Sequence, residues 1–302
     1  MLPFSRVAII GLGLIGSSVA RAVRAKMPTV ALTGTDADPA VRQRVIDLGL
    51  LDDVADTPAA AVVDADLVIL AVPLGAFAVV ARDIAADLSP GAIVSDVGSA
   101  KQTVIDAVRP LLPENVHLIP AHPVAGTERS GPDAGFPTLF EDRWCILTPL
   151  EGADETAVTR LAEFWTRLGS RVEIMDARHH DLVLAVTSHI PHLIAYSIVG
   201  TAADLEGVTR GEVIKYSAGG FRDFTRIAAS DPTMWRDVFL TNKEAVLEIL
   251  GRVTEDLAAL QRAIRWGDAD TLFQRFTSSR DIRRAIIDAG QDTADPDFGR
   301  HH

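Results

Sequence analysis

The composition of this 302-residue chain is that of a globular protein, with 48% hydrophobic and 23% charged residues, well away from the disordered class. The formal net charge of -12 argues against a nucleic-acid-binding protein, which needs a basic face to neutralise phosphates. An anionic substrate would therefore have to be held by local cations. Cys145 is the only cysteine, so no intrachain disulfide can form, and we expect a cytoplasmic protein in a reducing compartment.

Neither the N-terminus nor the longest uncharged run has the features of a signal peptide or a membrane-spanning segment. Residues 1–10 lack the long apolar core of a signal peptide and lead directly into a folding motif. The uncharged run 67–81 contains Pro73 and Gly75 and is shorter than the roughly 18 apolar residues that suggest a membrane span. We therefore expect no membrane partner.

Short apolar runs alternate with helical patterns over the first half of the chain. We expect strands at residues 6–10, 30–35, 66–72, 92–97, 117–123, 143–148 and 171–176, and helices at 14–25, 39–48, 75–88, 100–112 and 154–168. The run 66–72 has little polar alternation, which is typical of a strand covered on both faces. This order predicts an α/β domain, a Rossmann-type doubly wound and mostly parallel sheet with helices on both faces.

The strand signal stops at about residue 177, and helical patterns follow over 179–205, 231–267 and 268–290. In the second of these, apolar residues recur at helical spacing: Val246, Ile249, Leu250, Val253, Leu257 and Leu260. We place a boundary near Asp176, with a dinucleotide-binding domain over residues 1–176 and an all-helical domain over 177–302. Apolar helical surface of this extent is commonly buried against a second subunit, so we expect a homodimer.

A glycine-rich segment lies between the first strand and the first helix. Gly11, Gly13 and Gly16 form G-x-G-x-x-G, the spacing that allows a tight turn, backbone approach to a pyrophosphate and close helix packing. Asp36 ends the next strand, where its carboxylate would accept from a ribose 2′-hydroxyl and repel a 2′-phosphate. This favours NAD over NADP, with a ligand-free turn as the alternative. The expected cofactor-binding residues are Gly11, Gly13, Leu14, Ile15, Gly16, Asp36, Val72, Pro73 and Ser99.

Ligands of such sheets lie beyond the carboxyl ends of the strands, where His122 and Ser99 are expected. Histidine as a residue type titrates near neutrality, so His122 would suit accepting a proton from a substrate hydroxyl while hydride leaves the same carbon. An isolated histidine before Pro123 is, however, more often part of a turn. Ser99 could equally be the N-cap of a helix starting at Ala100, or serve in both ways.

Five segments, in order and in both halves, carry a resemblance to a known family. They are "GLGLIGSS", "DVGSAK", "HPVAGTERSGPDAGFPTLFEDRWCILTP", "TSHIPHLIAY" and "GGFRDFTRIAASDPTMWRDVFLTN". Together they resemble prephenate dehydrogenase, most closely the cyclohexadienyl dehydrogenase branch of tyrosine biosynthesis. The resemblance implies an NAD-dependent oxidative decarboxylation of prephenate or arogenate, in which hydride leaves ring C4 and the ring carboxylate is lost as carbon dioxide. We expect either substrate to be accepted.

The resemblance also implies roles for individual residues. His122 would accept the C4-hydroxyl proton, and Ser99 would orient His122. Arg226 would clamp the ring carboxylate of the dianionic substrate, a task that suits a planar bidentate donor. Thr127 and Glu128 would lie at the mouth of the site.

Three further cations lie near these residues in the sequence. Arg222 and Arg236 flank Arg226 in the sequence. The sequence alone does not choose which of these three arginines binds the ring carboxylate, although a surface position is the simpler interpretation of Arg222 and Arg236. Lys101 is either a solvated helix residue or a local cation near the substrate, and we expect the second.

His189 and His192 are three residues apart in "SHIPH". Such spacing can suit a metal pair, and His179 and His180 are nearby, but no carboxylate-rich or cysteine partner set accompanies them, so we expect no metal. The resemblance places His189 and His192 in the substrate cleft, with His192 at the side-chain end of the substrate. Trp235 either walls the same pocket or only packs between helices.

Two other classes of protein remain open. A different NAD(P)-dependent hydroxyacid dehydrogenase or imine reductase could share this domain order, but such enzymes commonly place a catalytic lysine on a helix of the second domain. A non-catalytic NAD-sensing protein would bind the dinucleotide without needing His122, Ser99 and Arg226 together.

Overall fold

The computed structural model describes residues 2–127, 129–204, 212, 215 and 219–288. The chain forms two compact units, Met1–Val246 and Leu247–His302, and each is considered by itself. All the expected site residues belong to the first unit. The boundary expected near Asp176 is thus not where the contacts within the chain divide, and it stays a prediction about domain organisation.

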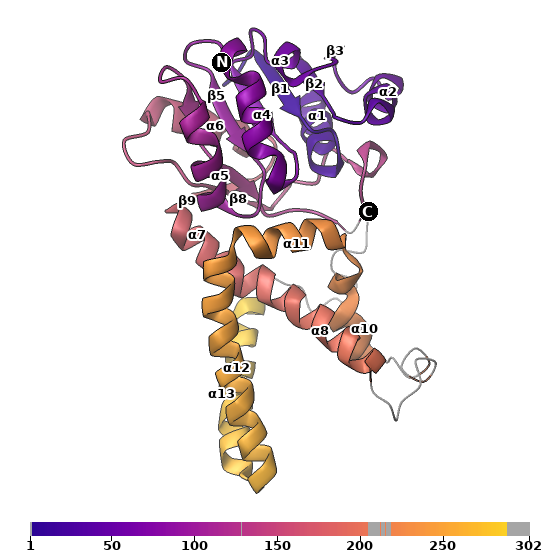
Figure 1. Cartoon of the computed structure of the whole chain (residues 1–302), viewed down its shortest axis with the longest axis vertical. Coiled ribbons are helices and arrows are strands. Elements are labelled where there is room, and N and C mark those ends of the chain that lie inside the picture. Colours follow the sequence, from indigo (N-terminus) through magenta and orange to yellow (C-terminus); the bar gives the residue numbers. More distant parts are fainter. Residues whose placement is uncertain (1, 128, 205–211, 213–214, 216–218, 289–302) are drawn as a thin grey trace. The chain divides into compact units, whose positions relative to one another are not determined.

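A six-stranded parallel sheet forms the centre of the first unit, drawn in indigo to magenta in Figure 1. Its order, β3-β2-β1-β4-β5-β6, is that of a doubly wound dinucleotide-binding fold, and the predicted fold class is confirmed. The strand β3, which pairs only through Asp53 and Val54, was not predicted. The strands are β1 (Arg6–Ile10), β2 (Ala31–Thr35), β3 (Asp53–Val54), β4 (Leu67–Leu70), β5 (Ile93–Asp96) and β6 (His117–Leu118).

Helices cover both faces of this sheet. Successive residues of β1 point to opposite faces, so Val7 and Ile9 join one apolar cluster whereas Ala8 and Ile10 join the other. The helices are α1 (Leu14–Lys26), α2 (Pro39–Asp47), α3 (Pro58–Ala61), α4 (Phe77–Ile84) and α5 (Lys101–Val108), with 3-10 turns at η1 (Leu74–Ala76), η2 (Ala85–Asp87) and η3 (Arg109–Leu111).

A second sheet of three strands follows, in the order β7-β8-β9. The predicted strand 117–123 is divided, because Pro120 has no N–H for a strand ladder, and the chain passes there from β6 in the first sheet to β7 in the second. The pair β7–β8 is antiparallel and β8–β9 is parallel. The elements are β7 (Ala121–Pro123), η4 (Pro132–Ala134), β8 (Trp144–Leu147), α6 (Glu155–Arg167) and β9 (Arg171–Ile174).

The helical region of the first unit begins with one long helical stretch in three parts. These are α7 (Ala177–Leu184), the π-helical segment η5 (Ala185–His189) and α8 (Ile190–Asp204). The wider π turn is accommodated next to Pro191, which has no N–H to donate to a regular helix. The expected helix 231–267 is divided at Asn242, whose backbone leaves the helical conformation. The remaining elements of this region are α10 (Gly219–Thr225), η6 (Arg226–Ala229) and α11 (Pro232–Thr241). The helix α12 (Lys243–Trp266) begins in the first unit and continues in the second, and α13 (Ala269–Asp288) belongs to the second.

The helical stretch Ala177–Ala202 is, by length and composition, apolar enough to cross a membrane. This stretch is longer than the uncharged run 67–81, on which the expectation of no membrane span was based. The stretch begins with polar contacts to α5 through Asp181, and 28% of its most apolar window is buried within the described structure. Its exposed apolar residues, among them Val186 and Val199, are available for packing against another protein surface.

Candidate active site

His122 lies on β7, which begins shortly after the carboxyl end of β6. It pairs with Ile146 of β8 in the antiparallel register. The residue is only 8% exposed, so its ring needs protein partners for its polar atoms. The position is the edge of the parallel sheet at which ligands bind in doubly wound folds.

The ring of His122 contacts a second histidine, His180 of α7. The two rings meet edge to face, with centroids 5.1 Å apart, and Nδ1 of His122 lies 2.9 Å from Nε2 of His180. His180 in turn contacts the next residue in the chain, with its Nδ1 2.8 Å from Oδ1 of Asp181. The three side chains therefore form a linear relay from β7 into α7.

The hydrogen-bond partners in this relay determine the tautomer of each ring. The Asp181 carboxylate accepts from two backbone N–H groups of α5, so it is the acceptor for His180 and Nδ1 of His180 carries the proton. A neutral His180 then presents a lone pair at Nε2, to which His122 donates from Nδ1. The consequence is a bare Nε2 on His122, the form that a general base requires.

Both rings of the relay are held neutral by their surroundings. Burial lowers the pKa of His122 well below its ordinary value of 6.5, and the nearby His180, Lys101 and His189 lower it further. Burial also lowers the pKa of His180, although the hydrogen bond to Asp181 opposes this. His122 is thus unprotonated throughout the neutral pH range.

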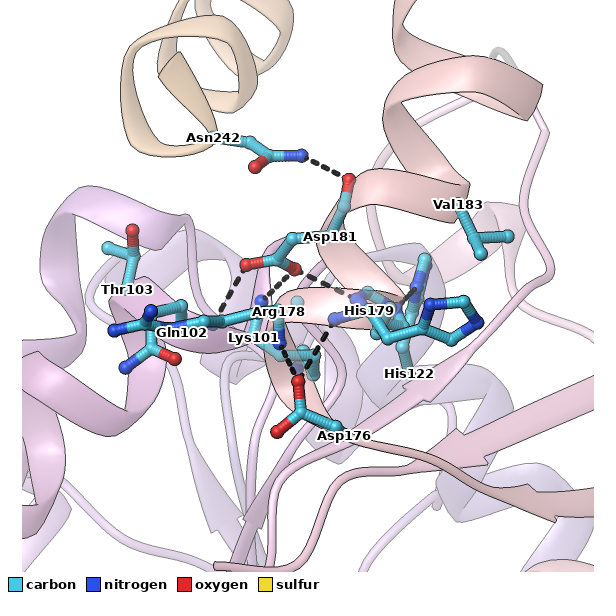
Figure 2. A network of polar contacts seen from close by, with 12 residues as sticks. Lys101, Gln102, Thr103, His122, Asp176, Arg178, His179, Asp181, Val183 and Asn242 are labelled. Carbon is cyan, nitrogen blue, oxygen red and sulfur yellow. Dashed lines mark hydrogen bonds and ion pairs between the residues drawn. The ribbon is translucent and has the colours of Figure 1, made fainter. Parts of the chain in front are cut away.

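Asp181 joins the relay to the first turn of α5. Its Oδ1 accepts from the backbone N–H of Lys101 at 2.7 Å and its Oδ2 from that of Gln102 at 2.9 Å, as Figure 2 shows. These are N–H groups that a helix leaves without an intrahelical partner, and a carboxylate also suits the positive end of the helix dipole. Sequence reasoning missed His180 and Asp181 as a site pair.

Ser99 is not the N-cap of α5, and its expected role in orienting His122 stays a prediction. The N-cap of α5 is Ala100, whose methyl side chain cannot cap the helix. Nδ1 of His122 bonds His180 rather than the serine. Ser99 lies half-buried in the segment between β5 and α5, and among the described residues we find no hydrogen-bond partner for its hydroxyl.

Lys101, expected to be a cation near the substrate, is instead completely buried. Its ammonium forms an ion pair with Asp96, which is equally buried, and donates to the carbonyl oxygen of Ala121 at 2.7 Å. The other carboxylate oxygen of Asp96 accepts from the N–H of Ala121 at 3.2 Å. Lys101 therefore contacts the backbone that precedes His122 and has no solvent-accessible surface to offer a substrate.

A second group of aromatic side chains comes from η5, α8 and α11. His192 stacks on Trp235, with centroids 3.6 Å apart and planes inclined by 23°, and it donates from Nδ1 to the carbonyl of Ser188. His189 is buried, and burial lowers its pKa to about 4. Burial lowers the pKa of His192, and the positive charge of Arg226 lowers it further, so Arg226 is close enough to act on His192.

The amide of Asn242 fixes the tautomer of His189. One N–H of its Nδ2 donates to the carbonyl of Asp181 at 2.8 Å (Figure 2), and the other to Nδ1 of His189 at 3.1 Å. The proton of the neutral His189 is therefore on Nε2. This N–H and the indole N–H of Trp235 are buried donors without a partner among the described residues.

Arg226, the first residue of η6, differs from its two neighbours in sequence. Arg222 lies 3.4 Å from Asp223 and Arg236 lies 2.7 Å from Asp237. Arg226 is exposed, and no carboxylate pairs with it among the residues that the structure describes. Among the described residues, its guanidinium is thus the one of these three that has no carboxylate partner and can bind an anionic ligand.

The mouth of the site is only partly described. Thr127 is exposed, and its hydroxyl accepts from the backbone N–H of Arg129. Glu128, expected beside it, lies outside the described residues. Within the described part of the chain no group of His, Cys, Asp and Glu side chains is arranged to hold a metal ion.

The glycine-rich segment has the geometry of a dinucleotide-binding turn. Gly11 has φ +96°, and a Cβ there would lie 2.4 Å from the carbonyl oxygen of Ala71; a Cβ at Gly16 would lie 1.9 Å from the carbonyl oxygen of Gly11. A Cβ at Gly13 would meet nothing within 4 Å, as expected where a ligand approaches the backbone. No side chain caps α1, so its N-terminal N–H groups are available to phosphates.

The remaining cofactor candidates surround this turn. Asp36 accepts from the N–H of Leu12 at 2.8 Å and from that of Asp38 at 3.0 Å, and its remaining lone pairs can accept from a ribose. Its carboxylate therefore also holds the glycine-rich turn in place. Leu14, Ile15 and Val72 are half-buried and Pro73 is exposed.

Comparisons with known proteins agree with this geometry. Residues 19–174 match the family described as prephenate dehydrogenase, nucleotide-binding domain, and residues 176–278 match prephenate dehydrogenase, dimerization domain. The cyclohexadienyl dehydrogenase of Zymomonas mobilis is 44% identical over 286 residues, which cover 95% of this chain and 97% of that protein.

Two solved structures are similar over nearly the whole chain. The prephenate dehydrogenase from A. aeolicus in complex with hydroxyphenyl propionate and NAD+ has a TM-score of 0.86 and 32% identity, over 93% of this chain and 98% of that one. Synechocystis arogenate dehydrogenase has a TM-score of 0.76 and 25% identity, over 92% and 99%. This chain belongs to the prephenate dehydrogenase family.

Proposed function

We propose that the chain catalyses the NAD-dependent oxidative decarboxylation of prephenate, of arogenate, or of both. Bound NAD supplies the acceptor for the hydride that leaves ring C4, while the ring carboxylate departs as carbon dioxide and the ring becomes aromatic. The protein has to remove the proton of the C4 hydroxyl, bind the carboxylates and exclude water. The family membership of the chain supports this reaction class.

The observation that carries the mechanism is the bare Nε2 of His122. Because His180 and Asp181 hold the proton of His122 on Nδ1, Nε2 can accept the substrate hydroxyl proton without a change of tautomer. A hydroxyl that loses its proton to Nε2 places negative charge on the C4 oxygen, which favours departure of hydride from the same carbon. His180 then shares the positive charge of the protonated base through the short contact to Nδ1.

Substrate carboxylates need donors, and two sets are suitable. Arg226 has no carboxylate partner in the described structure, and we assign it to the ring carboxylate, where a bidentate pair would be strongest. The buried N–H groups of His189 and Trp235 lack partners, and a carboxylate or carbonyl oxygen of the substrate side chain would satisfy them. His192 and Trp235 then form one wall of the pocket, whereas Ser99, Thr127 and Glu128 stay candidates near its entrance.

The names of the relatives support acceptance of both substrates. One similar protein is called a cyclohexadienyl dehydrogenase, one a prephenate dehydrogenase and one an arogenate dehydrogenase. Prephenate and arogenate differ only at a pyruvyl or alanyl side chain, which is distant from C4. We infer that discrimination between them depends on the side-chain end of the pocket and not on the relay at His122.

We further propose a cytoplasmic homodimer. The second of the two matching family descriptions is that of a dimerization domain. Large apolar side chains are exposed on the described helices α12 and α13, including Trp266 at 75% and Phe273 at 71% exposure, more than a surface tolerates without a partner. These helices would pair with the same surface of a second subunit.

The test is turnover by the purified full chain with each pairing of prephenate or arogenate with NAD or NADP, followed by the absorbance of the reduced nicotinamide. We expect turnover with both substrates and a lower KM for NAD than for NADP, because Asp36 repels a 2′-phosphate. A chain that binds NAD but turns over neither substrate would instead be the non-catalytic NAD-binding protein considered above. Turnover of a small hydroxyacid or imine alone would favour the other reductase classes.

A further inference from the structure

The buried ion pair between Lys101 and Asp96 is not used by the proposed chemistry. Both side chains are completely inaccessible to solvent, and two charges removed from water are costly unless several hydrogen bonds compensate. The pair lies between the end of β5 and the start of α5, next to β7. Both side chains of the pair also form hydrogen bonds to the backbone of Ala121, the residue before His122.

The side chains of the pair clamp the peptide groups next to His122. The ammonium of Lys101 donates to the carbonyl oxygen of Ala121 at 2.7 Å, and Asp96 accepts from the N–H of Ala121 at 3.2 Å. The carbonyl of Ala121 shares a rigid peptide plane with the backbone nitrogen of His122. Fixing that plane fixes the direction in which the Cα–Cβ bond of His122 leaves β7.

The backbone of the same lysine holds the ring of His122 from the other side. The N–H of Lys101 donates to Oδ1 of Asp181 at 2.7 Å, and Oδ1 also accepts from His180. His180 in turn accepts from Nδ1 of His122. The ammonium of Lys101 thus leads to the main chain next to His122, and the amide of the same residue leads through Asp181, which Figure 2 shows beside Lys101, and His180 to the imidazole of His122.

We propose that Lys101 is a positioning residue for proton abstraction, which acts through His122 by fixing both its backbone and the relay that sets its tautomer. The proposal rests on the proposed role of His122 as the base. Lys101 is not a catalytic residue, since it is buried away from any substrate. Its charge also faces the base: the charged and titratable groups around the His122 ring are Lys101, His180 and His189, with Asp96 and Asp181 directly behind the first two.

The test compares Lys101→Met with the double variant Asp96→Asn/Lys101→Met, in which no buried carboxylate is left unpaired. The double variant keeps the test available if the single one does not fold, and thermal unfolding identifies the folded variants. Lys26→Met is the matched control, because Lys26 is an exposed lysine that pairs with Glu141 on the surface. His122→Asn is assayed in parallel with the same substrate.

We expect kcat to fall by about 10- to 100-fold in the folded Lys101 variants with KM for the substrate little changed, because a displacement of about 1 Å of a reacting group can cost 10²-fold. The pH profile of kcat/KM supplies the readout that a merely structural role would not move. Lys101 lowers the pKa of His122, so its removal shifts the acidic limb of the profile to higher pH. Lys26→Met should match the wild-type chain in both measurements.

Two results would overturn the proposal. One is a folded Lys101 variant with wild-type kcat, and the other is a lowered kcat with an unmoved acidic limb, which would mean that only the amount of active protein had changed. The parallel variant separates this outcome from failure of the proposed function. If His122→Asn loses turnover and a Lys101 variant gives either of these two results, only the positioning role of Lys101 is refuted. If His122→Asn keeps its turnover, His122 is not the base and the proposed function itself is refuted.

Discussion

Replacing His180 by Phe tests the relay that prepares His122. Phenylalanine keeps an aromatic ring next to His122, where the two rings now meet edge to face at 5.1 Å, but it has no nitrogen. Nδ1 of His122 then loses the acceptor that lies 2.9 Å away. Asp181 keeps its two hydrogen bonds from the N-terminus of α5, so the fold around the relay is retained.

The size of the effect follows from the burial of His122. The whole residue is 8% exposed, so water cannot readily replace the lost acceptor. A buried donor without a partner costs about 1–3 kcal/mol. That penalty falls on the tautomer with the proton on Nδ1, which is the tautomer with a free Nε2. Because each 1.36 kcal/mol is a factor of ten in rate, we expect kcat to fall roughly 5- to 150-fold.

The assay is steady-state turnover at saturating NAD, with His180→Gln as the matched variant. The side-chain oxygen of glutamine can take the place of Nε2 of His180 and accept from His122, so we expect His180→Gln to keep several-fold more activity than His180→Phe. Wild-type kcat in His180→Phe would show that His122 needs no acceptor at Nδ1. Equal losses in the two variants would show that ring packing, and not the acceptor, is what His180 contributes.

Three further predictions concern the cofactor turn, the carboxylate clamp and pH. Gly16→Ala should destabilise the fold, because its Cβ would lie 1.9 Å from a carbonyl oxygen, whereas Gly13→Ala should leave the melting temperature unchanged and weaken NAD binding in a titration; wild-type NAD affinity in Gly13→Ala would contradict this. Arg226→Ala should raise KM for the substrate at least tenfold, while Arg222→Ala, which removes an arginine already paired with Asp223, should not; equal KM values would move the clamp elsewhere. The pKa of His189 is lowered to about 4 in the folded chain, so between pH 6.5 and 4 the unfolded chain binds more protons and stability falls as the pH falls, by up to about 3 kcal/mol. Urea unfolding of His189→Gln should show a shallower loss over that window, and an identical slope would contradict the assignment.

The features that the sequence predicts well are local ones. The turn around Gly11, Gly13 and Gly16 depends on neighbouring residues only, and the strand before it and the helix after it have clear apolar periods. The division of the expected strand 117–123 is a tertiary effect, because Pro120 stops one ladder and lets the chain join another sheet. The break at Asn242 is similar, since its amide is used by Asp181 and His189, contacts that no helical period indicates.

The relay of His122, His180 and Asp181 and the burial of Lys101 could not be predicted from the sequence, for a different reason. His122 and His180 are 58 residues apart, and their contact depends on the packing of α7 against α5. A lysine in a sequence is almost always exposed, so the burial of Lys101 could not be expected without its partner Asp96. The doublet of His180 and Asp181 at the start of a helix is a local signal that was available, but His180 was weighed only as a neighbour of the possible metal pair His189 and His192, and Asp181 was not weighed at all.

The most direct test of the account is the kcat of His122→Asn with prephenate and NAD, measured together with the dissociation constant of NAD. Asparagine can still hydrogen-bond His180 but cannot take up a proton. We expect a kcat lowered by roughly 10²- to 10⁴-fold and an unchanged affinity for NAD. A kcat within a few-fold of the wild-type value would contradict the assignment of His122 as the base, and with it the mechanism built on the relay.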